Sequence, residues 1–288
     1  MKILVTGGAG LIGRYVVDRL VSSGHDVVAV VRTASARSPE CLHIATTEVI
    51  GDVSDVELMN AVMPGLESVV HLAAIPAPTG HTARELLTAN SITTMTVLEA
   101  AATHGVKSVV MASSISILGM AWCEQLMSPL YLPVDEAHPL RPTEGYGLSK
   151  ECDEASARMA TRRWGLPILA MRFPFTGTSE MIDARRRDPE QALVVAKELW
   201  AYLEVRDAAR AVELAVVAMT EGGLGGYSVL NVIADDVLLD QPLRELMREW
   251  HPNVPLAADD YIFGGAYDVA EARELIGFDA EYLLHDRI

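Results

Sequence analysis

Short runs of consecutive apolar residues alternate along the chain with longer stretches in which apolar residues recur every three or four positions. The runs are too short for helices and are typical of strands that are buried on both faces of a sheet. This alternation predicts an α/β fold, in which helices cover both faces of a parallel sheet. The expected strands are residues 3–5, 27–31, 48–50, 68–74 and 109–112, and the two longest helices are 82–104 and 146–164.

Three glycines lie where the first strand turns into the first helix, in a G-x-x-G-x-x-G spacing one residue away from the commoner G-x-G-x-x-G. At such a turn glycine allows a tight bend, a close approach of the backbone to a pyrophosphate, and close packing of helix on strand. The helix N-terminus adds free N–H groups and partial positive charge. A glycine-rich turn without a ligand is the alternative, but this setting favours a Rossmann-type, doubly wound dinucleotide site. Its predicted contacts are Gly7, Gly10, Leu11, Ile12 and Gly13.

The end of the second strand is where such a sheet distinguishes NAD from NADP. An acidic residue there binds the ribose 2′-hydroxyl of NAD, but here Val31 is followed by Arg32, with Arg37 further on. Because an arginine can face a 2′-phosphate, we expect NADP in preference to NAD. The alternative is that Arg32 is a solvated loop residue and that specificity is loose.

The ends of the next strands supply further candidates, because ligands bind outside the carboxyl ends of parallel strands. Asp52, followed by Val53, can bond an adenine amino group or cap a helix that begins near Ser54. Small residues then end the fourth strand, where a cofactor needs close backbone approach, and Ile75 begins a loop that can form a substrate rim. The fourth strand's candidates are Leu72, Ala73 and Ala74.

A group of residues able to transfer protons follows the fifth strand. Ser113 and Ser114 lie at its end, and Tyr146 and Lys150 are four residues apart, on one face of a helix. Free tyrosine titrates near pH 10, and a nearby ammonium stabilises the phenolate and lowers its pKa. With a serine to hold the substrate oxygen and a cofactor to exchange a hydride, these residues predict an alcohol–ketone redox site. A half-buried tyrosine beside a solvated lysine is the alternative.

The segments TGGAGLIG, GDVSD, HLAA, ASS and YGLSK, in this order, resemble the extended short-chain dehydrogenase/reductase family of the NAD-dependent epimerase/dehydratase type. The resemblance implies that Tyr146 is the catalytic acid/base and that Lys150 also binds the nicotinamide ribose. It also implies that Ser114, five residues before Gly119, is the catalytic serine and that Asn90 supports the site. The segment expected against the nicotinamide is Phe173 and Pro174, and the expected homodimer face is formed by helices 82–104 and 146–164.

The sequence also departs from the family pattern. Leu118 replaces the usual tyrosine before Gly119, and the segment after Phe173 lacks the asparagine typical of nucleotide-sugar members. Both departures weaken a nucleotide-diphosphate sugar as substrate. The long segment between Ser114 and Tyr146 carries apolar bulk that can wall a pocket or pack on the surface. The substrate candidates are Ile75, Ser113, Ser114, Trp122, Phe175 and, by resemblance, Tyr202.

The second half of the chain reads as a smaller lobe. We expect a dinucleotide-binding domain at 1–172 and a mainly substrate-binding lobe at 173–288, from which about 199–233 returns to the first domain. Asp207 is expected to cap a helix running to Thr220. An arginine run at 185–187 can bind a carboxylate or phosphate, although such runs more often form a solvated face. The other elements expected are strands 199–205 and 227–233 and helices 243–250 and 270–276.

Composition bounds the partners. The formal net charge of −16, with a pI near 4.9, argues against nucleic acid and against an anionic membrane surface. Three scattered cysteines form no disulfide or metal pattern, and the chain shows neither a leader nor a membrane-length apolar run, so we expect a cytoplasmic protein without a metal.

Three functions fit these features. The first is an NAD(P)-dependent oxidoreductase that moves a hydride between the cofactor and a secondary alcohol or carbonyl of a sugar-like or small polar molecule. The second is a sugar or nucleotide-sugar epimerase or dehydratase, in which the hydride leaves and returns within one turnover. The third is a sensor that binds dinucleotide without turnover, which has no need of Ser114, Tyr146 and Lys150.

Overall fold

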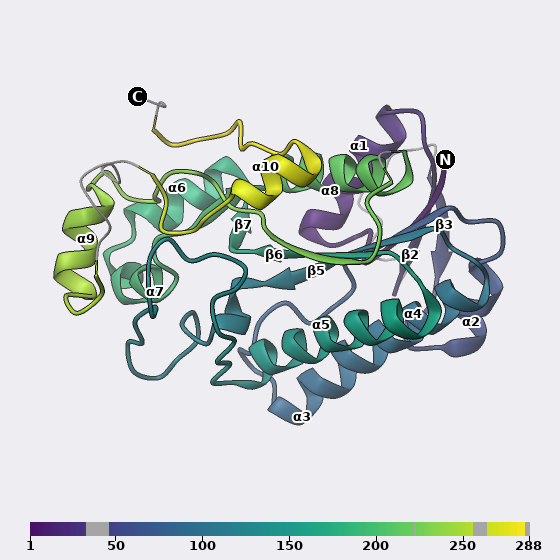
Figure 1. Ribbon diagram of the computed structural model, residues 1–288, viewed down its shortest axis with the longest axis horizontal. Coiled ribbons are helices and arrows are strands. Elements are labelled where there is room, and N and C mark those ends of the chain that lie inside the picture. Colours follow the sequence, from purple (N-terminus) through teal and green to yellow (C-terminus); the bar gives the residue numbers. More distant parts are fainter. Residues whose placement is uncertain (33–45, 222, 256–263, 286–288) are drawn as a thin grey trace.

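The computed structural model describes residues 1–32, 46–221, 223–255 and 264–285 (Figure 1). Arg37 lies outside these residues. Within them, seven parallel strands form one sheet in the order β3-β2-β1-β4-β5-β6-β9, which confirms the predicted α/β fold. The strands are β1 (Lys2–Thr6), β2 (Asp26–Val31), β3 (Thr47–Ile50), β4 (Ser68–His71), β5 (Ser108–Ser114), β6 (Ile168–Phe173) and β9 (Tyr227–Asn231).

Helices cover both faces of this sheet (Figure 1). Neighbouring side chains of a strand point to opposite faces. In β1, accordingly, Ile3 and Val5 belong to one hydrophobic cluster and Leu4 to the other. The first cluster includes residues of α1 (Leu11–Ser22), α8 (Val205–Thr220) and α10 (Ala270–Ile276). The second includes residues of α2 (Val56–Val62), α4 (Ile92–Thr103) and α5 (Gly145–Trp164).

The order of the strands reverses direction between β1 and β4. Strands added after β1 run first to one edge through β2 and β3, and then to the other through β4, β5 and β6. At such a switch point the loops that follow two neighbouring strands diverge to opposite faces and leave a crevice at their carboxyl ends. The fold therefore opens a ligand-sized space beside the glycine-rich loop that follows β1.

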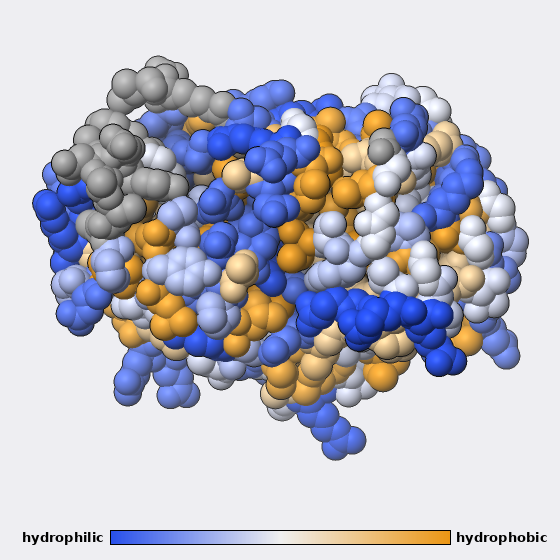
Figure 2. Space-filling view, in the orientation of Figure 1, coloured by the Kyte–Doolittle hydropathy of each residue, from blue (hydrophilic) through white to orange (hydrophobic). Residues whose placement is uncertain are grey.

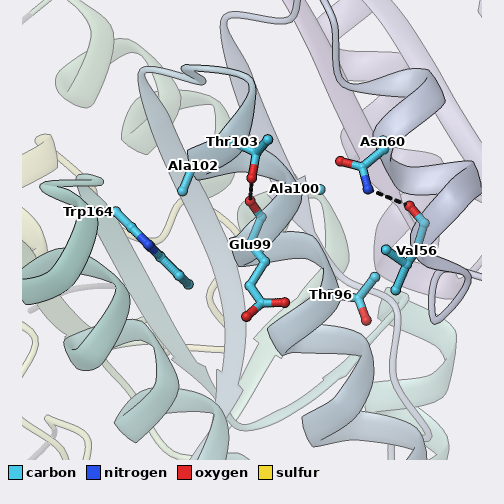
Figure 3. A pocket seen from close by; sticks show the side chains of 8 residues that line it. All are labelled: Val56, Asn60, Thr96, Glu99, Ala100, Ala102, Thr103 and Trp164. Carbon is cyan, nitrogen blue, oxygen red and sulfur yellow. Dashed lines mark hydrogen bonds between the residues drawn. The ribbon is translucent and has the colours of Figure 1, made fainter.

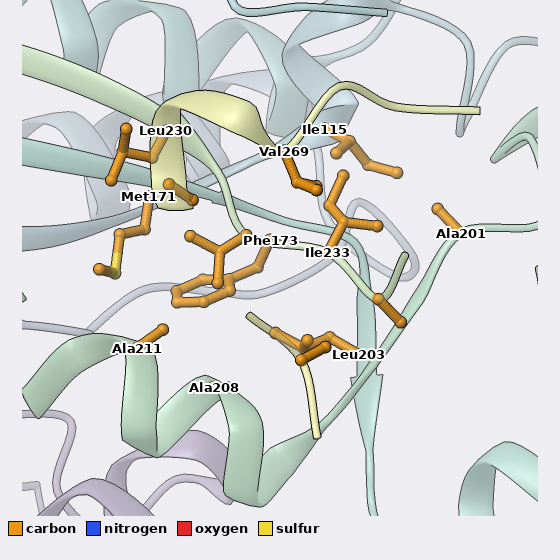
Figure 4. Close-up of a cluster of buried hydrophobic side chains, with 14 of the residues drawn as sticks. Ile115, Met171, Phe173, Ala201, Leu203, Ala208, Ala211, Leu230, Ile233 and Val269 are labelled. Carbon is orange, nitrogen blue, oxygen red and sulfur yellow. The ribbon is translucent and has the colours of Figure 1, made fainter. Parts of the chain in front are cut away.

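The chain after β6 forms a second sheet and several short helices. This sheet pairs β7 (Phe175–Gly177) with β8 (Tyr202–Glu204) in parallel. The chain then returns to the main sheet, because β9 pairs with β6. Ala208 and Ala211 of α8 face Met171 and Phe173 of β6 in the close view of the core (Figure 4). The remaining elements are α6 (Ser179–Arg187), η4 (Pro189–Gln191), α7 (Ala192–Lys197) and α9 (Leu243–Trp250).

Two predictions in this region are wrong. Residues 199–205 are not one strand, because Leu199 and Trp200 have φ of 54° and 55°, left-handed values that are incompatible with a strand. Asp207 is not the helix cap, since the Glu204 side chain accepts the N–H of Arg206 and α8 begins at Val205. Asp207 instead accepts backbone N–H groups from residues 281 and 282 and so ties the C-terminal segment to α8.

The predicted long helix at 82–104 is continuous but not uniform. It comprises α3 (Ala83–Leu86), the π-helical turn η2 (Leu87–Ser91) and α4. Thr82 and Glu85 form a capping box at its start. A π-turn adds one residue to a helical turn and is frequent at functional sites. Asn90 lies inside this turn and is fully buried.

The surface is mixed, as expected for a folded chain. On the face seen in Figure 2, hydrophilic residues and smaller apolar patches are interspersed. Among the residues described, no helix combines the length and the apolar composition needed to cross a bilayer.

Candidate active site

The glycine-rich loop after β1 is held against the end of β4. Gly7 has a φ of 70°, and a Cβ there would lie 2.8 Å from the backbone nitrogen of Ala73. A Cβ on Gly13 would lie 2.1 Å from the carbonyl oxygen of Gly7, because α1 starts directly on the loop. Both positions therefore require glycine. The helix N-cap, Gly10, provides no side-chain hydrogen bond, so the first N–H groups of α1 have no side-chain cap.

A cleft of about 510 Å³ opens beside this loop. It brings together most of the residues predicted to bind the cofactor, and Ile75 lies in the same wall. The predicted cofactor residues that are not among its lining residues are Leu11, Ile12 and Gly13 of α1, Tyr146 and Lys150 of α5, and Phe173 and Pro174. The lining is Gly7, Ala9, Gly10, Val30, Val31, Arg32, Asp52, Val53, Ser54, Leu72, Ala73, Ala74, Ile75, Thr88, Ala89, Asn90, Ile92 and Thr93.

Sequence reasoning missed one wall of this cleft. Thr88, Ala89 and Thr93 reach it from the π-turn and the start of α4. Their apolar and polar spacing is that of an ordinary helix, and a π-turn has no spacing signal of its own. Only the position of Asn90 in the family pattern pointed to this segment.

Asp52 lies in the cleft but does not cap a helix. Asp55 caps α2 by accepting the N–H groups of Glu57 and Leu58. Asp52 forms a turn of its own, in which Oδ1 accepts from the N–H and hydroxyl of Ser54 at 2.8 and 2.7 Å. These bonds lower the pKa of the Asp52 carboxyl, which favours its charged form.

The N-terminus of α5 fixes the position of Tyr146. The Glu144 carboxylate accepts the N–H groups of Tyr146 and Gly147 at 2.5 and 2.6 Å. A Cβ on Gly145 would lie 2.4 Å from Cα of Ala83, so the helix packs closely against α3. The Glu144 carboxylate and the packing on α3 therefore fix the backbone at Tyr146. Tyr146 exposes 8% of its surface.

Lys150 is buried one turn further along α5. Its Nζ donates to the carbonyl oxygen of Ala112 at 3.0 Å and to Oδ2 of Asp153 at 3.3 Å. Burial by itself lowers the pKa of the ammonium, but Asp153 and Tyr146 outweigh it and hold that pKa above its usual value. Lys150 therefore remains positively charged beside Tyr146, as the predicted chemistry requires.

Ser114 and Ser113 have different surroundings. The Ser114 hydroxyl donates to the hydroxyl oxygen of Ser116 at 3.1 Å. The same Ser116 oxygen accepts the N–H of Trp122 Nε1 at 3.1 Å. Trp122 is thus connected to the end of β5, and its ring is 37% exposed. Ser113 instead points into the interior, where its hydroxyl donates to Glu154 at 2.8 Å. This placement favours Ser114 over Ser113 as a substrate contact.

Asn90 connects the two halves of the site. Its side chain accepts the N–H of Ile75 at 2.8 Å and donates to the Ile75 carbonyl oxygen at 3.2 Å. It also donates to the Ser149 hydroxyl, which bonds to the carbonyl oxygen of Tyr146. Asn90 therefore ties the substrate-rim loop to the helix that carries Tyr146 and Lys150.

The other predicted residues lie at or behind the end of β6. Phe173 ends that strand and is buried, Pro174 separates it from β7, and Phe175 is half-buried. The guanidinium of Arg185 lies 4.2 Å from the Phe175 ring centre. Tyr202 is fully buried, and its hydroxyl lies 2.5 Å from Asp236, so the structure does not bring it to the cleft.

The arginine run does not form an anion site. Arg185 pairs with Glu198, Arg186 with Asp240 and Arg187 with Asp183, so the three charges have partners within the chain.

A glycine-lined cleft at the switch point of a parallel sheet defines a dinucleotide-binding α/β protein. The chain belongs to the NAD dependent epimerase/dehydratase family, whose model matches residues 3–231. This confirms the resemblance drawn from the sequence motifs.

Relatives of two activities are similar to the chain. UDP-glucose 4-epimerase of Streptococcus mutans is 31% identical over 178 residues, which are 60% of this chain and 51% of that protein. The chain thus matches about half the length of such relatives. L-arabinose 1-dehydrogenase (NAD(P)(+)) of Haloferax volcanii is 30% identical over 204 residues, which are 69% of this chain and 76% of that enzyme.

Solved structures are similar over almost the whole chain. The crystal structure of a UDP-galactose 4-epimerase has a TM-score of 0.72 and 26% identity, covering 98% of this chain and 94% of that one. MoeE5 in complex with UDP-glucuronic acid and NAD has a TM-score of 0.71 and 25% identity, covering 99% and 95%.

We expect Gly13→Ala to abolish dinucleotide binding. The added methyl group cannot fit 2.1 Å from the Gly7 carbonyl oxygen, so either the loop or α1 must move. Titration of NADH fluorescence measures the loss. Gly225→Ala is the control, since a Cβ at Gly225 would meet no atom closer than 3.9 Å and its φ lies outside the left-handed range. A Gly13→Ala protein with unchanged affinity would contradict the predicted role of the loop.

Proposed function

We propose that this chain is an NAD(P)-dependent oxidoreductase that moves a hydride between the nicotinamide and a secondary alcohol or carbonyl of a sugar-like or small polar molecule. The observation that carries the proposal is the charged Lys150 beside Tyr146, in a helix joined through Asn90 to the wall of the dinucleotide cleft. Ser114 ends β5 at the same carboxyl edge of the sheet. This is the arrangement that acid–base catalysis of an alcohol oxidation needs.

The residues present fit a dinucleotide. Gly7 and Gly13 leave space that a Cβ would fill, and the uncapped N-terminus of α1 suits a pyrophosphate. Asp52 and Arg32 line the part of the cleft at the ends of β2 and β3, where we place the adenosine. Leu72, Ala73, Phe173 and Pro174 are proposed to complete the pocket toward the nicotinamide.

In the proposed mechanism each side chain has one task. Tyr146 takes the proton of the substrate hydroxyl during oxidation and returns it during reduction. Lys150 stabilises the phenolate through its charge, and Ser114 holds the substrate oxygen by a hydrogen bond, for which its hydroxyl turns away from Ser116. The nicotinamide, when bound, supplies or accepts the hydride. Trp122 and Phe175 are proposed to bound the substrate space.

Three observations favour a small substrate and net redox. The segment after Phe173 lacks the asparagine of nucleotide-sugar members, and Arg185, Arg186 and Arg187 are each paired with a carboxylate within the chain. The dehydrogenase relative also matches a larger share of both chains than the epimerase relative does.

The second candidate is a sugar epimerase or dehydratase with internal redox. It is favoured by the family and by the several UDP-glucose 4-epimerases among the relatives. The two candidates differ in whether the reduced cofactor leaves the protein.

The experiment that separates them starts from the protein as isolated. Denaturation releases any bound dinucleotide, which is identified and quantified by chromatography. The leading proposal expects little bound cofactor and net NAD(P)H absorbance with alcohols, aldoses or uronic acids. Stoichiometric bound cofactor, with conversion of sugars or nucleotide sugars but no free NAD(P)H, would replace it by the second candidate.

We propose NADP as the preferred cofactor because Arg32 lines the cleft at the end of β2, where no acidic residue follows Val31. Replacement of Arg32 by alanine is expected to weaken NADPH binding while NADH binding changes little. Fluorescence titration with both cofactors measures this. Tighter binding of NADH than NADPH by the wild-type protein would reverse the assignment.

We propose a homodimer through helices 82–104 and 146–164, which comprise α3, η2, α4 and α5. Val56 of α2 exposes 57% of its surface beside α4. Between α2, α4 and the end of α5, a groove of about 300 Å³ is lined by residues that include Trp164 and Ala100 (Figure 3). Sedimentation equilibrium tests the assignment.

A reducing cytoplasm is the proposed location, in keeping with the free thiols of Cys123 and Cys152.

A further inference from the structure

Asp153 is a buried carboxylate that the mechanism above does not use. It lies on α5 one turn after Lys150, and none of its surface is exposed. Its Oδ2 accepts from Nζ of Lys150 at 3.3 Å, and both side chains of this pair are at least 95% buried. Oδ1 is also buried and accepts no full hydrogen bond from a described group, although the Thr94 hydroxyl lies close enough to favour the charged carboxylate. A buried carboxylate with an unpartnered oxygen is costly, so a structural explanation alone is weak.

The groups that face this carboxylate can be assigned from the hydrogen bonds around them. Oγ1 of Thr6 accepts from the N–H groups of Leu72 and Ala73, so its own proton goes to Nδ1 of His71, 2.7 Å away. His71 then carries its proton on Nε2 and donates to Thr94 at 3.2 Å. This leaves the Thr94 hydroxyl as a donor beside Asp153.

The charges near the pair are also defined. Burial and the Lys150 charge lower the pKa of His71 to about 3, so His71 is neutral at ordinary pH. Burial raises the pKa of the Asp153 carboxyl, and Lys150 and Thr94 act in the opposite direction. Glu154 is held by Arg172 and Arg158, and the Cys152 thiol is neutral because burial and Asp153 raise its pKa. Lys150 and Asp153 therefore form one ion pair, with neutral His71 and Thr94 on the facing elements.

We propose that Asp153 is a positioning residue of the redox site, which fixes the Lys150 ammonium and sets the pH range over which Tyr146 acts. Of the three Nζ donors of Lys150, Ala112 accepts one and Asp153 accepts another, so one donor remains. The inference rests on the proposed function. It assigns to Asp153 two opposing effects: it keeps Lys150 charged despite its burial, and it reduces the field that Lys150 exerts on Tyr146.

These two effects predict the direction of change in Asp153→Asn. Without the carboxylate, the Lys150 charge acts unopposed on Tyr146, and the phenolate forms at lower pH. The unpaired, buried ammonium also loses its proton at lower pH. The lower limit of the active pH range is therefore expected to move down by about one pH unit, from a Coulomb interaction across two helical turns. The upper limit is expected to move down by at least as much, because Asp153 contacts Lys150 directly. A residue that only supports folding would lower activity at every pH without moving either limit.

The test follows ionisation of Tyr146 by ultraviolet absorbance of the phenolate, as the difference between the wild-type protein and Tyr146→Phe. The same titration is made in Asp153→Asn and in Glu151→Gln, a control that removes a charge from a half-buried position of the same helix. NADH affinity against pH is the second readout. We expect the Tyr146 step and the upper limit of NADH binding to move to lower pH in Asp153→Asn only.

Two negative results are distinguishable. A folded Asp153→Asn protein in which both limits are unmoved overturns this proposal and leaves the proposed function standing. A wild-type titration identical to that of Tyr146→Phe overturns the proposed function, and this inference with it. If Asp153→Asn does not fold, Thr94→Val replaces it, because it keeps the carboxylate but removes its neighbouring donor. A smaller shift in the same direction supports the proposal, and no shift overturns it.

Discussion

Replacing Tyr146 by phenylalanine is expected to lower kcat by about 10²–10⁴-fold while leaving dinucleotide affinity unchanged. The ring is 8% exposed and its backbone is held by Glu144, so the loss of one hydroxyl leaves the packing of α5 intact. The substrate proton then has no acceptor beside Lys150. Steady-state kinetics on the substrate identified by the screen, together with NADH titration, measure the two quantities separately.

The matched control for this variant is Tyr282→Phe. Tyr282 is 40% exposed and lies against Arg206, on the C-terminal segment that Asp207 binds. We expect it to retain full activity. A Tyr146→Phe enzyme that also retained full activity would refute the proposed mechanism. If the wild-type protein bound dinucleotide but turned over none of the alcohols, ketones or sugars tested, the sensor function would become the better explanation.

The parallel sheet was predictable because its strands carry a signal that depends only on neighbours in sequence. Runs such as residues 27–31 are apolar at every position, and only a strand covered on both faces buries all of these side chains. The glycine-rich loop was predictable for a similar reason. Its glycines stand at a fixed spacing where a strand turns into a helix, which the sequence shows directly, and this spacing lets Gly13 pack against Gly7.

What could not be predicted depends on partners distant in the sequence. Tyr202 resembled a substrate residue, but its hydroxyl is taken by Asp236, 34 positions away. Asp207 resembled a helix cap, but the backbone of Glu281, 74 positions away, takes its carboxylate. Nothing in the sequence around Tyr202 or Asp207 indicates these partners. Reasoning from neighbouring residues therefore predicted a substrate contact for Tyr202 and a helix cap for Asp207.

The same limit applies to α5. The spacing of Tyr146 and Lys150 can be read from the sequence, whereas the roles of Asp153 and Glu154 on the same helix cannot. Asp153 and Glu154 are adjacent acids that a sequence reading would place on a solvated face. Both are fully buried, and each has a different basic partner, Lys150 for the first and Arg172 for the second.

Arg172→Met is expected to lower the free energy of unfolding by about 3–5 kcal/mol. The guanidinium of Arg172, at the end of β6, donates to both carboxylate oxygens of Glu154, at 2.9 and 3.0 Å, and to the carbonyl oxygen of Glu136. The methionine fills similar space but leaves Glu154 buried without its main partner. Ser113 and the more distant Arg158, at 3.6 Å, compensate only in part. Urea denaturation measures the loss.

The double variant Arg172→Met/Glu154→Leu separates the value of the ion pair from the cost of breaking it. With both charges removed, neither member of the pair remains buried without its partner, and we expect most of the stability to return, because a buried pair roughly offsets its own desolvation. Arg187→Met is the control: its side chain is 78% exposed, and loss of its pair with Asp183 should cost less than about 1 kcal/mol. Since Glu154 follows Lys150 by four residues, the single variant should also loosen α5 at the site. A stable Arg172→Met protein, or a double variant as unstable as the single one, would show that this ion pair does not hold the catalytic helix to the sheet.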